Sequence, residues 1–465
     1  MQNIDVVVGG GIAGLLAALL LAERDGRKVI LVEREADLGG LLRFFDYGSY
    51  GRFDYGMHNM YETGIPPLDD ILFGLLPESH WQLLEGSKRD LAGLYLNGTL
   101  QENSPFPDIR RLSAENWNAN ILSFFRQIQS DEPYNGANAY EDARTRLGVA
   151  IADSVIDPAV RKQFGKPATE MAAFSTRLTT LSRVVLFDEK PFSDLMASDY
   201  LRDRLAYPEQ RSLPEKWTSG RKAYYPKAYG IYRVIEAMVS RIKAAGVEIL
   251  SSASVKSINV VEGEVSSVQV GTQNGDREVK VGKLIWTSGL PVIAGLSNID
   301  LMQYKFDPPR KTIVVNLLLK NPPIMGDLFY FYCYEPGFYT FRVTNFGAYC
   351  DGAVREQGHP IAVELLMDEP LPDKEAIAAI AMKELLKIGV IKTSEDIAFQ
   401  AVEILTTGFP MPTTNNFSVL SDIRSKLQEK SISNLVLLGV MSEENIFFQR
   451  DVLSQTYTKL SAHLL

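Results

Sequence analysis

The hydrophobic pattern at the start of the chain predicts a strand, a helix and a second strand. Residues 4–8 (IDVVV) form a short apolar, β-branched run of the kind found in buried parallel strands. Residues 15–23 have a helical composition, the segment DGRK indicates a turn, and residues 29–32 (VILV) form a second apolar run. A strand, turn, helix and strand in this order are typical of an α/β unit.

Later segments predict the remaining kinds of element. Residues 113–211 carry many charges and little β character, which favours a helical region. Residues 254–289 are β-rich and contain a hairpin signal at Asn274-Gly275. Residues 434–465 predict a strand, a loop and a final helix. The segment between 231 and 242 predicts an amphipathic helix, whose apolar stripe is Ile231, Val234, Ile235, Met238 and Ile242.

Length and charge narrow the class of protein. At 465 residues the chain is too long for one ordinary core, so we expect two or three domains' worth of structure. The hydrophobic fraction of 46% and charged fraction of 23% are ordinary for a globular protein. The net charge of -9 argues against nonspecific binding to a nucleic acid backbone, which needs a basic surface. A local group of arginines around an anionic ligand is still compatible with this charge.

The cysteines and histidines give no sign of a disulfide framework or a metal site. Two cysteines, Cys333 and Cys350, in so long a chain predict a reducing compartment. The histidines, His58, His80, His359 and His463, lack metal-ligand spacing. The longest apolar run, IAGLLAALLLA, is too short to span a bilayer and lacks the basic residues that open a signal peptide. We therefore expect a cytoplasmic protein with no transmembrane segment.

A glycine motif follows the first predicted strand. Gly9 to Gly14 fits G-x-G-x-x-G, in which Gly9 makes the tight turn, Gly11 lets the backbone approach a pyrophosphate and Gly14 lets the helix pack on the strand. Ile12 and Ala13 open the helix, whose N-terminal N–H groups and positive dipole end suit the phosphates. Glu33, about 20 residues later and followed by Arg34, suits the ribose hydroxyls. The alternative is a glycine-rich turn in a plain α/β unit.

A second glycine pair extends the motif into a family resemblance. Residues 34–45 (READLGGLLRFF) place Gly39-Gly40 soon after the acidic residue. At this point the sequence resembles the flavoprotein superfamily of amine oxidases, protoporphyrinogen oxidase, phytoene desaturase and UDP-galactopyranose mutase. The resemblance implies noncovalent FAD, with Gly39, Gly40, Leu41 and Arg43 near its ribityl chain. The family often has arginine directly after the glycine pair, whereas Leu41-Leu42 intervene here.

The resemblance also implies the domain organisation. We expect a Rossmann-type, doubly wound FAD-binding domain assembled from residues 1–75, 225–297 and 425–465. Residues 76–224 would be a helical insertion and part of a mixed α+β substrate domain, and residues 298–424 its sheet. Further FAD contacts implied by the family are Val255, which meets the adenine through its backbone, and Gly439, which follows the last strand. The family also implies contacts from Asp451, Val452 and Leu453, which line the N-terminal end of the last helix.

Three segments point to one branch of the superfamily. The segments FYFYCYEPGFYTFRVTNFGAYC (residues 329–350), RFDYGMHN (52–59) and GFPMPT (408–413) resemble UDP-galactopyranose mutases. The resemblance implies that Arg342 holds a substrate diphosphate, since a guanidinium can grip two phosphate oxygens. The alternative for Arg342 is a structural salt bridge with Glu364. Tyrosines expected at the substrate are Tyr229, Tyr339 and Tyr349, and candidates for a uridine site are Trp217, Tyr224, Tyr225 and Tyr229.

His58 lies in the segment RFDYGMHN. In the mutase branch the histidine after the glycine lies against the flavin, where an imidazole near N5 responds to the redox state of the ring, so His58 and Arg342 are the candidate catalytic residues. The alternative is a buried histidine satisfied by a backbone carbonyl. The chain departs from the mutases at Gly439-Val440, where they usually carry Gly-Arg.

These observations leave three functions open. The first is a flavin oxidoreductase acting on a polar substrate, for which a nucleotide sugar is one candidate and NAD(P)H a candidate reductant. The second is a non-redox mutase that uses reduced flavin. The third is a scaffold that binds FAD without catalysis. We expect a small-molecule substrate and no nucleic-acid partner, and the sequence does not indicate an oligomeric state.

Overall fold

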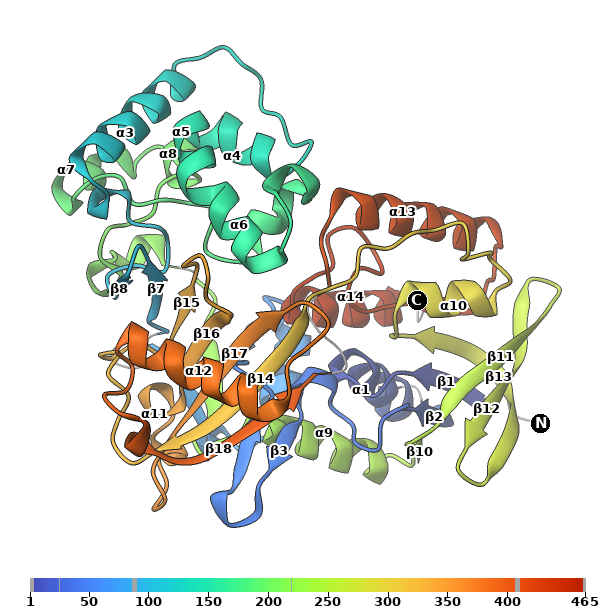
Figure 1. The fold of residues 1–465 in the computed structure, drawn as a ribbon. Coiled ribbons are helices and arrows are strands. Elements are labelled where there is room, and N and C mark those ends of the chain that lie inside the picture. The colour runs from blue at the N-terminus through green and yellow to red at the C-terminus, as the bar shows by residue number, and fades with distance from the viewer. Residues whose placement is uncertain (1–3, 25, 86–89, 219, 406–409, 463–465) are drawn as a thin grey trace. The chain divides into compact units, whose positions relative to one another are not determined.

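The computed structural model describes residues 4–24, 26–85, 90–218, 220–405 and 410–462 (Figure 1). They divide into two compact units. The first unit comprises Met1–Leu83, Arg221–Phe306 and Phe417–Leu465, and the second comprises Leu84–Gly220 and Asp307–Asn416. The segments expected to bind FAD, residues 1–75, 225–297 and 425–465, all lie within the first unit.

The first unit is built on a parallel sheet. Its strands run in the order β10 (Glu248–Leu250), β2 (Val29–Val32), β1 (Ile4–Val8), β13 (Gly275–Trp286) and β19 (Leu435–Leu437). β1 and β2 coincide with the predicted strands and are almost wholly buried, as expected at the centre of a parallel sheet. Helix α1 (Ile12–Leu19) packs against α9 (Tyr232–Ala244) and α14 (Gln449–Ala462). The Rossmann-type fold class is confirmed.

An antiparallel ribbon extends this sheet. Strand β13 pairs with β12 (Glu264–Thr272), which pairs with β11 (Ser254–Val261). The hairpin predicted at Asn274-Gly275 joins β12 to β13, and Gly275 has the positive φ of 109° that such a turn requires.

The predicted apolar stripe of α9 is buried from Ile231 to Ile242. The first helix begins at Ile12 and continues as a π-helix over Leu20–Arg24.

Smaller elements complete the first unit. They are the hairpin β3 (Phe44–Asp46) and β4 (Arg52–Asp54), the small sheet β5 (Met60–Tyr61), β9 (Ala223–Pro226) and β6 (Trp81–Leu83), and the helices α2 (Pro66–Phe73) and α10 (Leu290–Leu296). Helix α13 (Thr414–Glu429) begins in the second unit and ends in the first. A 3-10 turn over Gly40–Leu42 lies between the second glycine pair and the start of the β3–β4 hairpin at Phe44.

The second unit contains a mixed sheet with one apolar face. Its order is β18 (Ile397–Ile404), β14 (Lys311–Leu319), β17 (His359–Met367), β16 (Thr340–Asn345), β15 (Tyr330–Cys333), β7 (Ala92–Leu96) and β8 (Thr99–Gln101). Val343 and Val363 share a buried core with Leu385 of α12 (Lys374–Ile388). Because side chains alternate along strands, Arg342 and Glu364 lie on the opposite face.

A helical region belongs to the same unit and confirms the prediction for residues 113–211 (Figure 1, cyan to green). Its helices are α3 (Ala114–Ile128), α4 (Ala139–Leu147), α5 (Val149–Ile151), α6 (Asp157–Phe164), α7 (Glu189–Leu195) and α8 (Asp199–Arg202), and the short α11 (Phe346–Tyr349) follows β16. Phe124 and Val160 share one core with Leu94 of β7 and with Tyr334, so the helices pack on that edge of the sheet.

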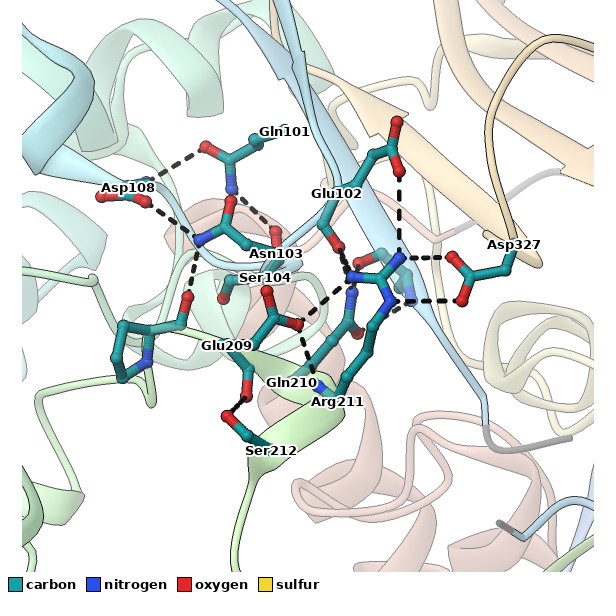
Figure 2. A network of polar contacts seen from close by, with 12 residues as sticks. Gln101, Glu102, Asn103, Ser104, Asp108, Glu209, Gln210, Arg211, Ser212 and Asp327 are labelled. Carbon is teal, nitrogen blue, oxygen red and sulfur yellow. Dashed lines mark hydrogen bonds and ion pairs between the residues drawn. The ribbon is translucent and has the colours of Figure 1, made fainter. Parts of the chain in front are cut away.

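A polar network fastens the end of the helical region to the sheet (Figure 2). Gln210 accepts a hydrogen bond from the Ala92 amide at 3.1 Å and donates to the Glu102 carbonyl at 2.6 Å. Arg211 donates from Nε to Asp327 at 3.1 Å, and Asn103 donates to Asp108 at 3.0 Å. The bonds of Arg211 and Asn103 to carboxylates are charge-assisted, and together with the bonds of Gln210 they hold the chain where it returns from the helices to the sheet.

Candidate functional site

The turn after β1 needs two of its glycines for its own packing. Gly9 has a φ of +106°, and its amide donates to the Val32 carbonyl at 2.8 Å. A Cβ on Gly9 would lie 2.4 Å from the hydroxyl of Thr287, and one on Gly14 would lie 1.8 Å from the Gly9 carbonyl oxygen. The sequence predicted the tight turn and the close approach of the helix, but it did not identify Thr287 as the side chain against which the turn packs.

Gly11 differs, because the protein itself does not need it to be glycine. It caps α1 in an extended conformation, with a φ of −72°, and a Cβ there would meet no described atom within 4 Å. The space in front of the first turn of α1 is therefore open. Ile12 and Ala13 begin that turn, where the N–H groups have no partner within the helix. An anion placed here would meet N–H donors and the positive end of the helix dipole.

The second glycine pair docks on the first motif. The Gly39 amide donates to the Gly10 carbonyl at 2.8 Å, and a Cβ on Gly40 would lie 3.3 Å from the Cα of Gly11. Both residues of the pair have a positive φ, 117° at Gly39 and 59° at Gly40. The two motifs, residues 9–14 and 39–40, therefore form one continuous surface of bare backbone, which we call the glycine cradle.

Residues beside the pair are placed differently from one another. Arg43 donates from Nε to the Gly40 carbonyl at 3.0 Å, and its guanidinium lies 5.0 Å from the centre of the Tyr55 ring. Leu41 is 40% exposed. Arg43 therefore braces the glycine cradle from within the protein, while Leu41 presents an apolar surface next to it.

Glu33 connects the cradle to the end of β2. Its carboxylate accepts hydrogen bonds from the Gly10 amide at 2.5 Å and the Glu35 amide at 2.7 Å. Each carboxylate oxygen keeps a further lone pair, which a ribose hydroxyl can use. The Glu33 carbonyl accepts from the Ala253 amide at 2.9 Å, which brings the start of β11 and Val255 to the same place. Arg34 points away, with its side chain 70% exposed beside Glu35.

Asp54 anchors the segment that carries His58. The fully buried carboxylate accepts from the Tyr225 hydroxyl at 2.6 Å and from the Ile231 amide, at the start of α9, at 3.1 Å. The Asp54 amide donates to the Tyr229 hydroxyl at 3.0 Å. Tyr225 and Tyr229, both expected near substrate, thus use their hydroxyls inside the first unit. His58 follows this anchor and is half-buried.

The start of α14 meets the same segment. Gln449 donates from Nε2 to the sulfur of Met60, which is close to His58 in the chain, at 3.1 Å. Asp451 accepts from the Phe448 amide at 3.2 Å, and Val452 and Leu453 are buried. Gly439 has a φ of +95°, and a Cβ there would lie 2.9 Å from the Thr287 carbonyl oxygen. Thr287 thus lies against glycines from both ends of the chain.

Arg342 lies in a bidentate ion pair within the second unit. Its Nε donates to Glu364 Oε1 at 2.8 Å and its Nη2 to Oε2 at 2.9 Å. The side chains are 16% and 8% exposed. Burial lowers and the Glu364 carboxylate raises the pKa of Arg342, with a net shift upward. Tyr332 lies beside the guanidinium, and burial raises the pKa of this tyrosine. The structural salt bridge considered as the alternative is therefore present, and the Nη1 nitrogen is not part of it.

The other expected substrate residues are dispersed. Tyr339 is 44% exposed, whereas Tyr349 is fully buried against Phe329 and Phe346. Trp217 packs against the helical core, and Tyr224 donates to Glu62 at 3.2 Å. The first two residues of GFPMPT, Gly408 and Phe409, and also His463 lie outside the described residues.

Neither a metal centre nor a membrane-spanning helix is found among the described residues. None of the His, Cys, Asp and Glu side chains in these ranges gather as a group of three or more that suits a metal ion. In the same part of the chain, no helix combines the length and the apolar character needed to cross a membrane.

Comparison with known proteins agrees with this geometry. Residues 7–72 match the NAD(P)-binding Rossmann-like domain family. No protein of curated function is similar enough in sequence to match the chain. Among solved structures, a reduced UDP-galactopyranose mutase shares 17% identity and a TM-score of 0.78, over 100% of this chain and 94% of that one. A candidate protoporphyrinogen oxidase from Exiguobacterium sp. 255-15 shares 16% identity and a TM-score of 0.71, over 100% and 99%.

A third similar structure is a CLA-producing fatty acid isomerase from P. acnes, with 13% identity and a TM-score of 0.58, over 100% of this chain and 99% of that one. At these identities the likeness is one of fold. The resemblance expected from the sequence is thus confirmed at that level: the chain has the fold of the flavoenzyme superfamily that includes UDP-galactopyranose mutase and protoporphyrinogen oxidase.

Proposed function

We propose that this protein is a flavoenzyme that binds FAD noncovalently at the glycine cradle. The observation that carries the proposal is the open space at Gly11, which lies between the first turn of α1 and the docked Gly39-Gly40 pair. The fold has space for a side chain at Gly11, yet the residue there is glycine, and this leaves room for a ligand beside the backbone. The pyrophosphate is the part of FAD that this space suits, because the backbone donors and helix dipole there favour an anion.

The remaining contacts follow from the positions of the other residues. Glu33 would hold the adenosine ribose, and Val255 would meet the adenine. Gly39, Gly40, Leu41 and Arg43 would follow the ribityl chain, and Gly439 and the start of α14 would add further contacts to the cofactor. Leu41, Val440 and Phe448 are large apolar side chains that are 40–45% exposed in these segments, as suits a site that receives an apolar ring.

For the reaction we propose an oxidoreductase that acts on a polar small molecule in the cytoplasm. Bound FAD supplies the capacity to accept a hydride, while the protein orients the substrate and excludes water. His58 would lie near the flavin ring. Arg342 would contact an anionic group, and since Glu364 already occupies its Nε and Nη2 edge, the contact would use Nη1 or displace the carboxylate.

A mutase that uses reduced flavin is the second candidate. It is favoured by the segment F-x-R-V-T on β16, which carries Arg342 on the polar face of the sheet, and by the fold shared with a UDP-galactopyranose mutase. In that case the substrate is a nucleotide sugar and no net electrons are transferred.

One experiment separates the two candidates. Polar small molecules, nucleotide sugars among them, are added anaerobically to the oxidised protein and, in parallel, to protein whose flavin has been reduced with NAD(P)H, or with dithionite if NAD(P)H does not react. An oxidoreductase that takes a hydride from its substrate reduces one flavin for each product formed and acts only in the oxidised sample, whereas a mutase turns over many times in the reduced sample without net transfer of electrons. If no small molecule among those tested changes the flavin spectrum, the scaffold function is supported instead.

A further inference from the structure

Strand β16 carries a bulge directly before Arg342. Thr340 is paired with Leu365 of β17, and Arg342 is paired with Glu364, the neighbour of Leu365 in the chain. Phe341 is therefore an extra residue that has no opposite on β17. A β-bulge of this kind bends its strand, disrupts the ladder locally and changes the direction of the side chains beside it.

The bulge brings two neighbouring side chains to the same side of the sheet. In a regular strand, Phe341 and Arg342 would point to opposite faces. Here the ring centres of Phe341 and Tyr332 lie 5.2 Å apart, and the guanidinium carbon of Arg342 lies 5.9 Å from the centre of the same tyrosine ring. The direction of the Arg342 side chain therefore depends on the bulge.

Two buried charges of opposite sign hold the backbone at the bulge. The Glu384 carboxylate, from α12, accepts hydrogen bonds from the amides of Tyr339 at 2.8 Å and Thr340 at 2.7 Å. The ammonium group of Lys162, from α6, donates to the Thr340 carbonyl. Lys162 and Glu384 are each 8% exposed, and Thr340 is fully buried. Side chains from two helices thus fix the backbone just before the extra residue.

A regular strand would not need these charges, because its backbone groups would pair with the neighbouring strands. Burial of ions is costly, and apolar residues of similar volume often replace them without loss of stability. The cost is met directly before the residue to which the proposed function assigns the anionic group. We propose that Lys162 and Glu384 are positioning residues that hold the bulge and thereby orient Arg342 for that group. The inference rests on the proposed function and adds the residues that direct the arginine.

The test asks whether Lys162 acts through Arg342. UDP is titrated into the wild type, Lys162→Met, Arg342→Met and the double variant. Lys162→Met should weaken UDP binding about 10-fold in the wild-type background and should have no further effect when the guanidinium is absent. Arg161→Met, at the exposed neighbouring position of α6, is the control and should bind UDP like the wild type. Equal losses in both backgrounds would overturn the proposal.

Stability separates positioning from a general structural role. Because Lys162→Met removes a buried charge, the variant should be no less stable to urea than the wild type at about pH 7, although it binds UDP more weakly. Glu384→Gln keeps one acceptor for the two amides, so it should weaken UDP binding less than Glu384→Met does. Weaker binding that appears only in variants that are partly unfolded would overturn the positioning role.

A measurement without ligand tests the bulge itself. Hydrogen exchange, followed by mass spectrometry of a peptide covering residues 338–345, reports on the amides of Tyr339 and Thr340. These amides should exchange about 10-fold or more faster in Lys162→Met and Glu384→Met than in the wild type. Unchanged exchange would overturn the proposal whether or not UDP binds. Faster exchange in a protein whose wild type binds no UDP would contradict the anion contact of Arg342 and leave the bulge held as described.

Discussion

The hydroxyl of Tyr225 donates a 2.6 Å hydrogen bond to the carboxylate of Asp54, at a point where both side chains are fully buried. The same carboxylate accepts from the backbone amide of Ile231 at the start of α9. A negative charge at a helix N-terminus is favourable, since it meets the positive end of the helix dipole. Asp54 therefore joins the start of the His58 segment to α9, and the aspartate of RFDYGMHN acts as a structural anchor.

Replacing this anchor should destabilise the protein. Asp54→Asn keeps one oxygen but turns an NH₂ group toward donors that need an acceptor, so we expect a loss of about 1–3 kcal/mol in the free energy of unfolding. Chemical denaturation of apoprotein measures it. Asp46→Asn is the matched control in the same hairpin, because Asp46 is exposed and should change stability by less than about 0.5 kcal/mol. Equal stability of the two variants would contradict the anchoring role.

His58→Ala should change the flavin more than the fold. Removing a polar neighbour of the ring in a pocket poor in water should shift the flavin reduction potential and slow turnover. Spectroelectrochemical titration of the holoprotein measures the potential, and His80→Ala, at an exposed histidine, is the control. An unaltered potential with a large drop in melting temperature would show that His58 is a structural histidine.

Substitutions of Arg342 and of Glu364 should change the affinity for UDP in opposite directions. Arg342→Lys loses the fork that makes two hydrogen bonds, so binding of UDP should weaken by about 1–3 kcal/mol while FAD content is unchanged. Glu364→Gln removes the competing carboxylate and should strengthen UDP binding. Calorimetric titration of the holoproteins compares them. If all three proteins bind UDP equally, Arg342 serves only the salt bridge.

A buried lysine predicts a pH dependence of stability. Lys162 donates to the carbonyl of Thr340, and burial lowers its pKa to about 8 from the ordinary 10.5. The unfolded chain therefore binds more protons than the folded chain between these pKa values, so stability should rise with pH across this window. Burial of the charged Lys162 side chain lowers the free energy of unfolding, and this loss is fully present below about pH 8, where it amounts to about 3 kcal/mol.

The variant Lys162→Met tests this dependence. It lacks the titrating group, so its advantage over the wild type should be greatest near about pH 7 and should shrink toward about pH 10. Urea unfolding of both proteins across this range gives the difference. If the free energies of unfolding of the two proteins change with pH in parallel, Lys162 has the same pKa in the folded and unfolded states.

The sequence was sufficient for the elements whose pattern is local. The strands at residues 4–8 and 29–32, the stripe of α9 and the hairpin at Asn274-Gly275 were all predicted, because periodicity and turn residues determine them. The second glycine pair was recognised from its spacing. Its docking on Gly10 was not, because that contact depends on how the chain folds back after β2.

Contacts between distant segments could not be read from local patterns. Thr287 lies against Gly9 and Gly439, and Tyr225 reaches Asp54, only after the three segments of the first unit have assembled. For Arg342, both interpretations were considered, and the pair with Glu364 became visible from the register of β16 against β17.

If FAD binds in the open space at Gly11, a side chain placed there should abolish the FAD content of the protein. Flavin is released from the purified protein by acid and counted per chain for the wild type, Gly11→Val and Gly220→Val. Gly220 is the control, because a Cβ there also meets no atom within 4 Å. We predict about one FAD per chain in the wild type and in Gly220→Val, and none in Gly11→Val, with apoproteins of equal melting temperature. Full FAD content in Gly11→Val, or a colourless wild type that binds only NAD, would contradict FAD binding at Gly11.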